Sequence, residues 1–172
     1  MKFKEYKLEE ICSIITDYVA NGSFASLASN VKYLNNFGYA RLIRLVDQNS
    51  NYSSENSVWV DEKSYLFLKK TKLFGGEVII SNVGANLGTV FKCPKKSYFM
   101  TLGPNSIMIN TNDLCIQDYL YYYLLSKEGY DKLMSIVSGS AMPKFNKTDL
   151  RQIKILLPDK KIQNKIVKIL SN

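Results

Sequence analysis

The chain has 172 residues, and its 23 lysines and arginines outnumber 15 acidic residues, which gives a formal charge of +8 at neutral pH. It contains no histidine, which excludes Ser-His-Asp and Cys-His catalysis, a histidine general base and histidine-ligated zinc. The length and an apolar fraction of 46% fit one domain with a substantial core, and the positive charge makes a polyanion the expected partner.

The N-terminal part of the chain mixes helical and extended signals. Residues 7–20 carry apolar side chains at spacings near 3, 4 and 4, which predicts a helix with one buried face. Their β-branched side chains leave a strand toward Val19 open as the alternative. Asn21-Gly22-Ser23 indicates a turn, and residues 24–36 are polar, small and irregular, so we expect a long ordered loop there. Residues 39–47 are expected to form a strand.

The middle of the chain predicts strands. Residues 48–57 are expected to be a polar connection, 58–60 a short strand and 64–72 a short helix. The strongest strand signal is Val78-Ile79-Ile80, and a turn rich in glycine and asparagine leads from it to a second strand at 89–91. Further apolar strands are expected at residues 98–101 and 106–109.

The apolar period then changes. Leucine and tyrosine at helical spacing predict a helix over residues 115–134, and an Ile/Leu-rich strand is expected at 152–158. Asp159 is a suitable N-cap for a last helix, in which Ile162, Ile166 and Ile169 are separated by four and three residues. Strands before residue 110 and helices after it predict an α+β fold, twisted, β-rich and mostly antiparallel, with its helices in the C-terminal half.

The cysteines and the first residues bear on the compartment. Cys12, Cys93 and Cys115 are widely spaced and odd in number, and the opening MKFKEYKLEE lacks the apolar segment of a secretory signal. We therefore expect three unpaired thiols and a cytoplasmic location. No apolar run approaches the roughly 20 residues that cross a bilayer, and the basic residues are too scattered for a membrane-binding amphipathic helix.

Few residues suggest catalysis. The segment 84–88, Gly-Ala-Asn-Leu-Gly, invites a phosphate-loop interpretation, but a strand follows it where a phosphate loop needs a helix, so we favour a hairpin turn. Asp47, Asp61 and Glu62 lie in expected turns without the spacing of a nuclease. No methyltransferase motif or glycine-rich AdoMet loop is present, and three cysteines cannot form a four-thiolate cage. We expect no catalytic residue, no cofactor and no metal.

Basic and polar residues in the expected loops and strand margins suit a nucleic acid. Lysine outnumbers arginine twenty to three, so most of the charge is suited to phosphates, whereas Arg, Asn and Ser suit base edges. Tyr33 and Phe37 are placed to touch a base or sugar. The candidate nucleic-acid contacts are Ser23, Tyr33, Asn35, Arg41, Arg44, Asn51, Lys69, Lys70, Lys72, Asn86, Lys144 and Lys147.

Several segments in order resemble the target-recognition domain of Type I restriction-modification specificity subunits. The strand and spaced glycines of residues 76–88 resemble one family element, and 139–150 and 153–158 resemble the next two. The family's following helix usually contains Glu-Gln-x-x-Ile; here residues 162–166 read Ile-Gln-Asn-Lys-Ile, so the glutamine and isoleucine are kept and the glutamate is lost. The opening YKLEEICSIITDYVANGSFAS is also similar, so the resemblance covers nearly the whole chain.

This resemblance implies a non-catalytic protein that reads one half of a bipartite site in double-stranded DNA. It implies modification (methyltransferase) subunits, which bind AdoMet, and a restriction subunit as partners. Residues 1–158 would be the DNA target-recognition domain and 159–172 the start of a spacer or dimerisation helix. Through Ile162, Ile166 and Ile169 that helix would pack on a partner, on a second copy or on the domain itself.

The family's specificity subunits carry two such domains, so this chain would be a half-subunit, a truncated product or a fragment. Two other functions remain open from the sequence. One is a small nucleic-acid enzyme, either a nuclease or a methyltransferase, and the other is a basic interaction protein without specificity for DNA.

Overall fold

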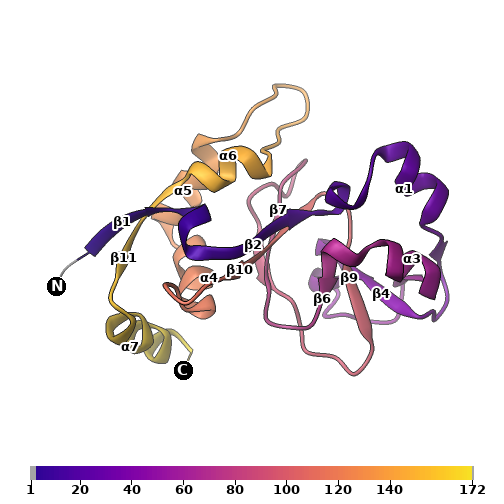
Figure 1. Ribbon diagram of the computed structural model, residues 1–172, viewed down its shortest axis with the longest axis horizontal. Helices are drawn as coiled ribbons and strands as arrows, with labels where there is room; N and C mark the ends of the chain where they lie inside the picture. The colour runs from indigo at the N-terminus through magenta and orange to yellow at the C-terminus, as the bar shows by residue number, and fades with distance from the viewer. Residues whose placement is uncertain (1–2, 172) are drawn as a thin grey trace.

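The structure is a computed structural model and describes residues 3–171 (Figure 1). The strands are β1 (Phe3–Lys7), β2 (Cys12–Asp17), β3 (Tyr33–Leu34), β4 (Ala40–Ile43), β5 (Val58–Val60), β6 (Lys72–Leu73), β7 (Val78–Ser81), β8 (Val90–Lys92), β9 (Phe99–Leu102), β10 (Ser106–Thr111) and β11 (Lys154–Pro158). The α-helices are α1 (Phe24–Asn30), α2 (Leu45–Asn49), α3 (Glu62–Phe67), α4 (Gln117–Leu125), α5 (Lys127–Ser135), α6 (Lys147–Gln152) and α7 (Lys160–Leu170). Three short 3₁₀ helices are η1 (Leu8–Ile11), η2 (Tyr18–Asn21) and η3 (Lys69–Thr71).

The strands form three sheets along an elongated molecule. A two-stranded sheet pairs β1 with β11, a four-stranded sheet has the order β2-β10-β7-β8, and a five-stranded sheet has the order β3-β5-β4-β9-β6. Within these sheets only β4 and β9 run parallel. Figure 1 shows both chain ends with β1, β11 and α7 at one end, and the five-stranded sheet with α1 and α3 at the other. The predicted α+β, mostly antiparallel fold is confirmed.

The four-stranded sheet lies in the middle of the molecule and is buried on both faces. In β10, Ile107 and Ile109 belong to one apolar cluster and Met108 to a second. In β7, Val78 belongs to the first cluster and Ile79 to the second. Successive strand residues point to opposite faces, so the first cluster joins this sheet to the C-terminal helices and the second joins it to the five-stranded sheet. A third cluster packs α1 and α3 on the other face of the five-stranded sheet.

The N-terminal expectations were partly wrong. Residues 7–20 are not a helix; they form η1, β2 and η2, so the strand alternative was right for residues 12–17. Hydrogen bonding to β10 makes residues 12–17 a strand. Neighbouring side chains then point to opposite faces, so Ile15 is buried against the core while Ile14 is 40% exposed. The expected loop at 24–36 contains α1, which Ser23 caps by accepting from the Ser26 N–H at 3.2 Å.

Later boundaries also differ from expectation. The strand predicted over 39–47 stops at Ile43 and gives way to α2, and α6 was not foreseen. The helix predicted over 115–134 is two helices that meet at Ser126, where a Cβ on Gly129 would lie 2.1 Å from the Tyr123 carbonyl oxygen. The strands at 58–60, 78–80, 89–91, 98–101, 106–109 and 152–158, the helix near 64–72 and the hairpin at 84–88 are confirmed to within a few residues.

The last helix, α7, is fixed to the domain by a buried glutamine. Asp159 caps it as predicted, accepting from the Ile162 N–H at 3.0 Å. One turn later, the Gln163 side chain is fully buried; it accepts from the Ile116 N–H at 2.8 Å and donates to the carbonyls of Leu114 at 3.1 Å and Pro158 at 2.9 Å. The glutamine noted in the sequence thus ties α7 to the start of α4 and the end of β11. Within residues 3–171, no helix is long and apolar enough to cross a membrane.

Replacing Gln163 with leucine should destabilise the fold despite the similar volume. The change leaves one buried N–H and two carbonyls without partners, which should lower the free energy of unfolding by about 2–4 kcal/mol. Urea unfolding measures this, with Asn164→Ala as the exposed neighbouring control, expected within about 0.5 kcal/mol of the wild type. Equal stability of the two variants would refute the structural role of Gln163.

Candidate nucleic-acid interface

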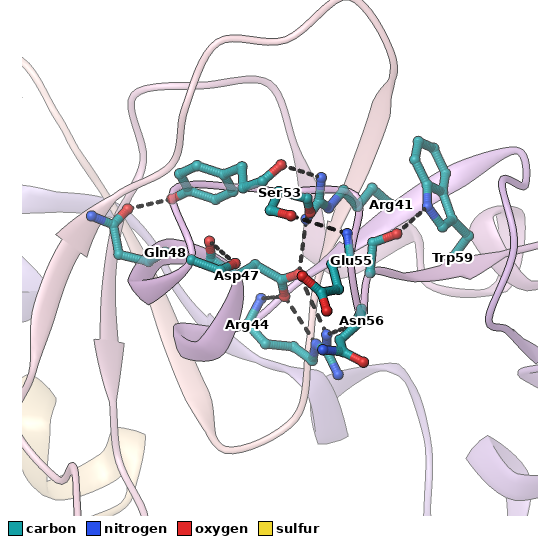
Figure 2. A network of polar contacts seen from close by, with 11 residues as sticks. Arg41, Arg44, Asp47, Gln48, Ser53, Glu55, Asn56 and Trp59 are labelled. Atoms are coloured by element: carbon teal, nitrogen blue, oxygen red, sulfur yellow. Dashed lines mark hydrogen bonds and ion pairs between the residues drawn. The ribbon is translucent and has the colours of Figure 1, made fainter.

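One buried ion pair organises the exposed end of the five-stranded sheet. Arg41, in the central strand β4, is 3% exposed, and its Nη2 donates to Asp47 Oδ1 at 3.0 Å. Asp47, in α2, is 2% exposed and also accepts from the Arg44 backbone N–H at 3.0 Å and from Arg44 Nε at 2.9 Å. Both oxygens of one carboxylate thus bind two guanidinium groups and the start of a helix (Figure 2).

The same two arginines hold the loop that follows, residues 50–57. Arg41 Nη1 donates to the Tyr52 carbonyl at 2.9 Å and Nη2 to that of Ser53 at 2.7 Å, while Arg44 Nη2 donates to the Asn56 carbonyl at 2.8 Å. Three carbonyls in one short loop therefore accept from fixed guanidinium groups. Because Arg41 lies inside the protein, this loop is positioned from beneath by the sheet.

The backbone of this 50–57 loop is unusual. Asn51, Tyr52 and Asn56 have φ angles of 49°, 58° and 58°, in the left-handed region that non-glycine residues seldom adopt. Asparagine tolerates this region; Tyr52 is held there by its carbonyl contact and by donating its hydroxyl to Gln48 Oε1 at 2.6 Å. The result is an ordered loop that exposes polar side chains, which are Ser50, Asn51, Ser53, Ser54, Glu55 and Asn56.

A second segment, residues 35–39, packs beside this loop. Both β3 and β4 pair with β5, so the 35–39 crossover has to pass over β5. There the Phe37 ring lies on the Trp59 ring, with centroids 4.4 Å apart. Trp59 Nε1 donates to Ser57 Oγ at 3.0 Å, at the end of the 50–57 loop. Trp59 thus joins the crossover to the loop.

The arginines do not occupy the positions that we expected. Arg41 is buried, and its two terminal nitrogens bind Asp47 and two carbonyls while its Nε is buried without a partner, so it is not available to touch a phosphate, and that expectation is corrected. Arg44 is partly exposed but is shared between Asp47 and the Asn56 carbonyl. Both arginines position the loop. Asn51 in the loop and Asn35 in the crossover are exposed, as a contact residue must be.

The three lysines near β6 differ in freedom. Lys69 is exposed, whereas Lys70 donates from Nζ to the Ala20 carbonyl at 2.9 Å. Lys72 places its ammonium group 4.5 Å from the centre of the Tyr65 ring, a cation–π contact. All three lie in β6 or just before it, at one edge of the five-stranded sheet.

Ser23 and Tyr33 lie near a cavity beside α1. Ser23 caps this helix, and the Tyr33 hydroxyl donates to that of Tyr18 at 2.9 Å. Burial, followed by this hydrogen bond, raises the pKa of Tyr18 well above its ordinary value. The cavity has a volume of about 470 Å³, and its lining, mostly apolar, includes Tyr33 and Asp17.

The remaining candidates belong to a different pair of segments. Asn86 is exposed in the β7–β8 turn, which is bound to the 138–147 segment because Gly84 N–H donates to the Pro143 carbonyl at 3.0 Å. Lys144 is exposed there, but Lys147 is paired with Asp17 at 2.6 Å. This ion pair neutralises the charge that we expected Lys147 to offer.

Sequence reasoning missed two residues on which the site depends. Asp47 was interpreted as a turn residue, although its spacing of three from Arg44 and six from Arg41 could have suggested a cluster. Trp59 was interpreted as an ordinary strand residue. Its contact with Phe37 depends on the crossover over β5, which no local pattern reveals.

Thiol and metal chemistry have little support in the described part of the chain. Burial raises the pKa of Cys12 and of Cys115 to about 12, so both thiols stay protonated at neutral pH. Burial also raises the pKa of Cys93. Residues 3–171 contain no group of three or more cysteine, aspartate or glutamate side chains arranged to hold a metal.

Comparison with known proteins gives a consistent result. Residues 1–172 match the family model described as "Type I restriction modification DNA specificity domain". None of the curated proteins matches the chain.

Solved structures with a similar fold come from type I systems. One belongs to work on complex assembly and conformational transition of the type I R-M system (TM-score 0.67, 18% identity, covering 98% of this chain and 37% of that one). Another is the S subunit of the Type-I restriction-modification system from M. genitalium (TM-score 0.59, 14% identity, covering 99% of this chain and 38% of that one). A third is the HsdS subunit from Thermoanaerobacter tengcongensis (TM-score 0.58, 19% identity, covering 98% of this chain and 36% of that one). The chain therefore spans less than two fifths of the length of these three chains.

Removing the buried carboxylate should be far more damaging than removing an exposed one. Asp47→Ala leaves the Arg41 guanidinium buried without a counter-charge, which should lower the free energy of unfolding by about 3–5 kcal/mol. Asp118, which pairs with Lys92 at 2.6 Å while 39% exposed, is the matched control, and Asp118→Ala should cost less than about 1 kcal/mol.

Urea unfolding measures both variants, and limited proteolysis reports on the 50–57 loop. At native conditions, Asp47→Ala should be cut in this loop much faster than the wild type, since three carbonyls lose their fixed donors. Comparable stability of the two variants, with no increase in loop cleavage, would contradict the role assigned to Asp47.

Proposed function

The chain belongs to the Type I restriction modification DNA specificity domain family, and from this premise we propose that it reads one half of a bipartite site in double-stranded DNA. It would act as the target-recognition part of a specificity subunit, while partner subunits methylate and cleave. The observation that carries this proposal is the 50–57 loop, whose exposed Asn and Ser side chains are held in place by a buried Arg41–Asp47 ion pair.

Such a loop has the chemistry for reading base edges. Asparagine offers a donor and an acceptor side by side, which match adenine in the major groove, and serine can contact several bases. Each good bidentate contact discriminates against a wrong base by about 1–3 kcal/mol. A loop fixed before binding does not have to be ordered by the DNA, so more of the contact energy remains for discrimination. Asn51, Ser54 and Asn56 are the exposed residues that we assign to this task.

Lysines supply the affinity that does not depend on sequence. The chain carries a formal charge of +8, and Lys69, Lys72 and Lys144 have no ion-pair partner among the described residues. Phosphate contacts of this kind fix the orientation of a protein on the duplex and make binding sensitive to salt.

The last helix is proposed to dock a partner. Ile166 packs partly against the domain core, and Ile162 is half-buried, whereas Ile169 is 73% exposed and Leu170 52% exposed. We propose that residues 1–158 form the recognition domain and that 159–172 begin a spacer or dimerisation helix; Asn172 lies outside the described residues. Modification and restriction subunits, or a second copy of the chain, would use this end.

Three unpaired thiols favour a reducing compartment, the cytoplasm.

Selection from random duplex DNA should recover a short preferred sequence. Binding to random duplex should fall with added salt, with a log–log slope of about −0.9 for each phosphate neutralised. The variant Asn51→Ala should relax the preference at one position by about 1–3 kcal/mol while leaving that slope unchanged. Asn164→Ala, on α7, is the exposed asparagine control and should change neither quantity.

The outcomes separate the three functions. A flat salt curve, or equal and weak binding to all duplexes, would support a basic interaction protein instead. Turnover of plasmid DNA with Mg²⁺ or AdoMet would support a nucleic-acid enzyme and contradict the proposal.

A further inference from the structure

The 35–39 crossover carries a highly exposed aromatic ring, that of Phe37. This side chain is 79% exposed at the middle of the 35–39 crossover, between the exposed Asn36 and the partly buried Gly38. Single exposed apolar residues are ordinary at a protein surface, so the exposure of Phe37 gains meaning only from the residues around it. The ring is nevertheless held, because it lies on the buried Trp59.

The crossover is pressed against the sheet, which leaves Phe37 little room to fold inward. At Gly38 a Cβ would lie 3.0 Å from each of three atoms, in Leu34, Trp59 and the Val60 carbonyl, so only glycine fits easily here. The next residue, Tyr39, donates its N–H to the Val60 carbonyl at 2.9 Å, and its ring stacks on Phe99 at 5.0 Å. The ring of Phe37 is therefore presented outward from a rigid base.

The surroundings of Phe37 combine aromatic rings with polar and basic groups; Trp59, which contacts Phe37, also contacts the Tyr98 ring at 5.1 Å. Asn35 and Asn36 precede it and are exposed, and the polar 50–57 loop is tied to the same Trp59 through Ser57. Beyond that loop, Lys96 places its ammonium group 5.5 Å from the Tyr52 ring. Exposed rings together with amides, hydroxyls and a lysine match the flat faces, polar edges and phosphates of a nucleic acid.

We propose that Phe37 is a wedge that enters between two base pairs of the bound duplex, unstacks that step and bends the DNA. The proposal rests on the proposed function, because it assumes that the 50–57 loop faces the same duplex. Asn35 and Asn36 would contact the base edges beside the opened step. Apolar side chains inserted between base steps kink a duplex by about 20–90°, and the extra protein surface that the bent duplex contacts offsets the cost of unstacking.

The test uses the full chain and a duplex that contains the sequence recovered by selection. Energy transfer between dyes at the two duplex ends measures bending, and 2-aminopurine fluorescence at each step in turn measures unstacking. The wild type should bend the duplex and brighten 2-aminopurine at one step. Phe37→Ala should lose both signals and bind roughly 5- to 100-fold more weakly. Phe37→Leu, which keeps a smaller wedge, should retain part of the bend.

Two controls keep the result specific. Phe3→Ala removes an equivalent ring, 50% exposed, in β1 at the opposite end of the molecule (Figure 1), and should bend DNA like the wild type. A duplex with a mismatch at the opened step is already partly unstacked, so on it the difference between Phe37→Ala and the wild type should shrink.

Three results would overturn the wedge. Phe37→Ala could bind and bend the selected duplex like the wild type, which removes the wedge and leaves the proposed function standing. Phe37→Ala could keep the bend and instead lose binding to a purified methyltransferase subunit, which makes this ring a protein contact. Finally, wild type and variant could both fail to bind duplex DNA, which refutes the proposed function itself.

Discussion

The buried ion pair between Arg41 and Asp47 is the constraint on which the candidate interface depends. Burying two charges is costly, and a pair of apolar residues of similar size often stabilises a fold as well or better. The advantage of this pair lies in what else the arginine does. Its Nη1 and Nη2 also donate to the carbonyls of Tyr52 and Ser53, so a charge inside the sheet fixes the path of a loop on its surface. Arg44 extends the same arrangement to Asn56.

The rest of the fold supports this arrangement. The four-stranded sheet is packed on both faces, which leaves the five-stranded sheet free to carry loops at one end while the C-terminal helices and both chain ends lie at the other. The 50–57 loop and the 35–39 crossover are separate segments of the chain, and both contact Trp59. A rigid sheet with variable polar loops is the architecture that lets one fold serve many target sequences. The buried Gln163 in turn connects this domain to the helix proposed to reach a partner.

The sequence predicted those elements whose signal is local. The apolar, β-branched run at residues 78–80, the glycine-rich hairpin and the Asp159 cap depend on neighbours in the chain, and all three are confirmed. Residues 12–17 were ambiguous because β-branched residues can satisfy both periods, and pairing with β10 decided the outcome. The burial of Arg41 was out of reach, since an arginine at the margin of an expected strand looks exposed until the position of Asp47 in space is known. The family resemblance identified the domain without identifying its contacts.

The central claim, that the Arg41–Asp47 pair exists to fix a base-reading loop, is tested most directly by removing the pair without removing the fold. In the double variant Arg41→Met/Asp47→Leu, both charges leave together, so overall stability should change by only a few kcal/mol in either direction. The ratio of affinities for the selected and random duplexes is the quantity to measure. We predict that this ratio falls toward one while salt-dependent binding to random duplex persists. An unchanged ratio in a folded double variant would contradict the account.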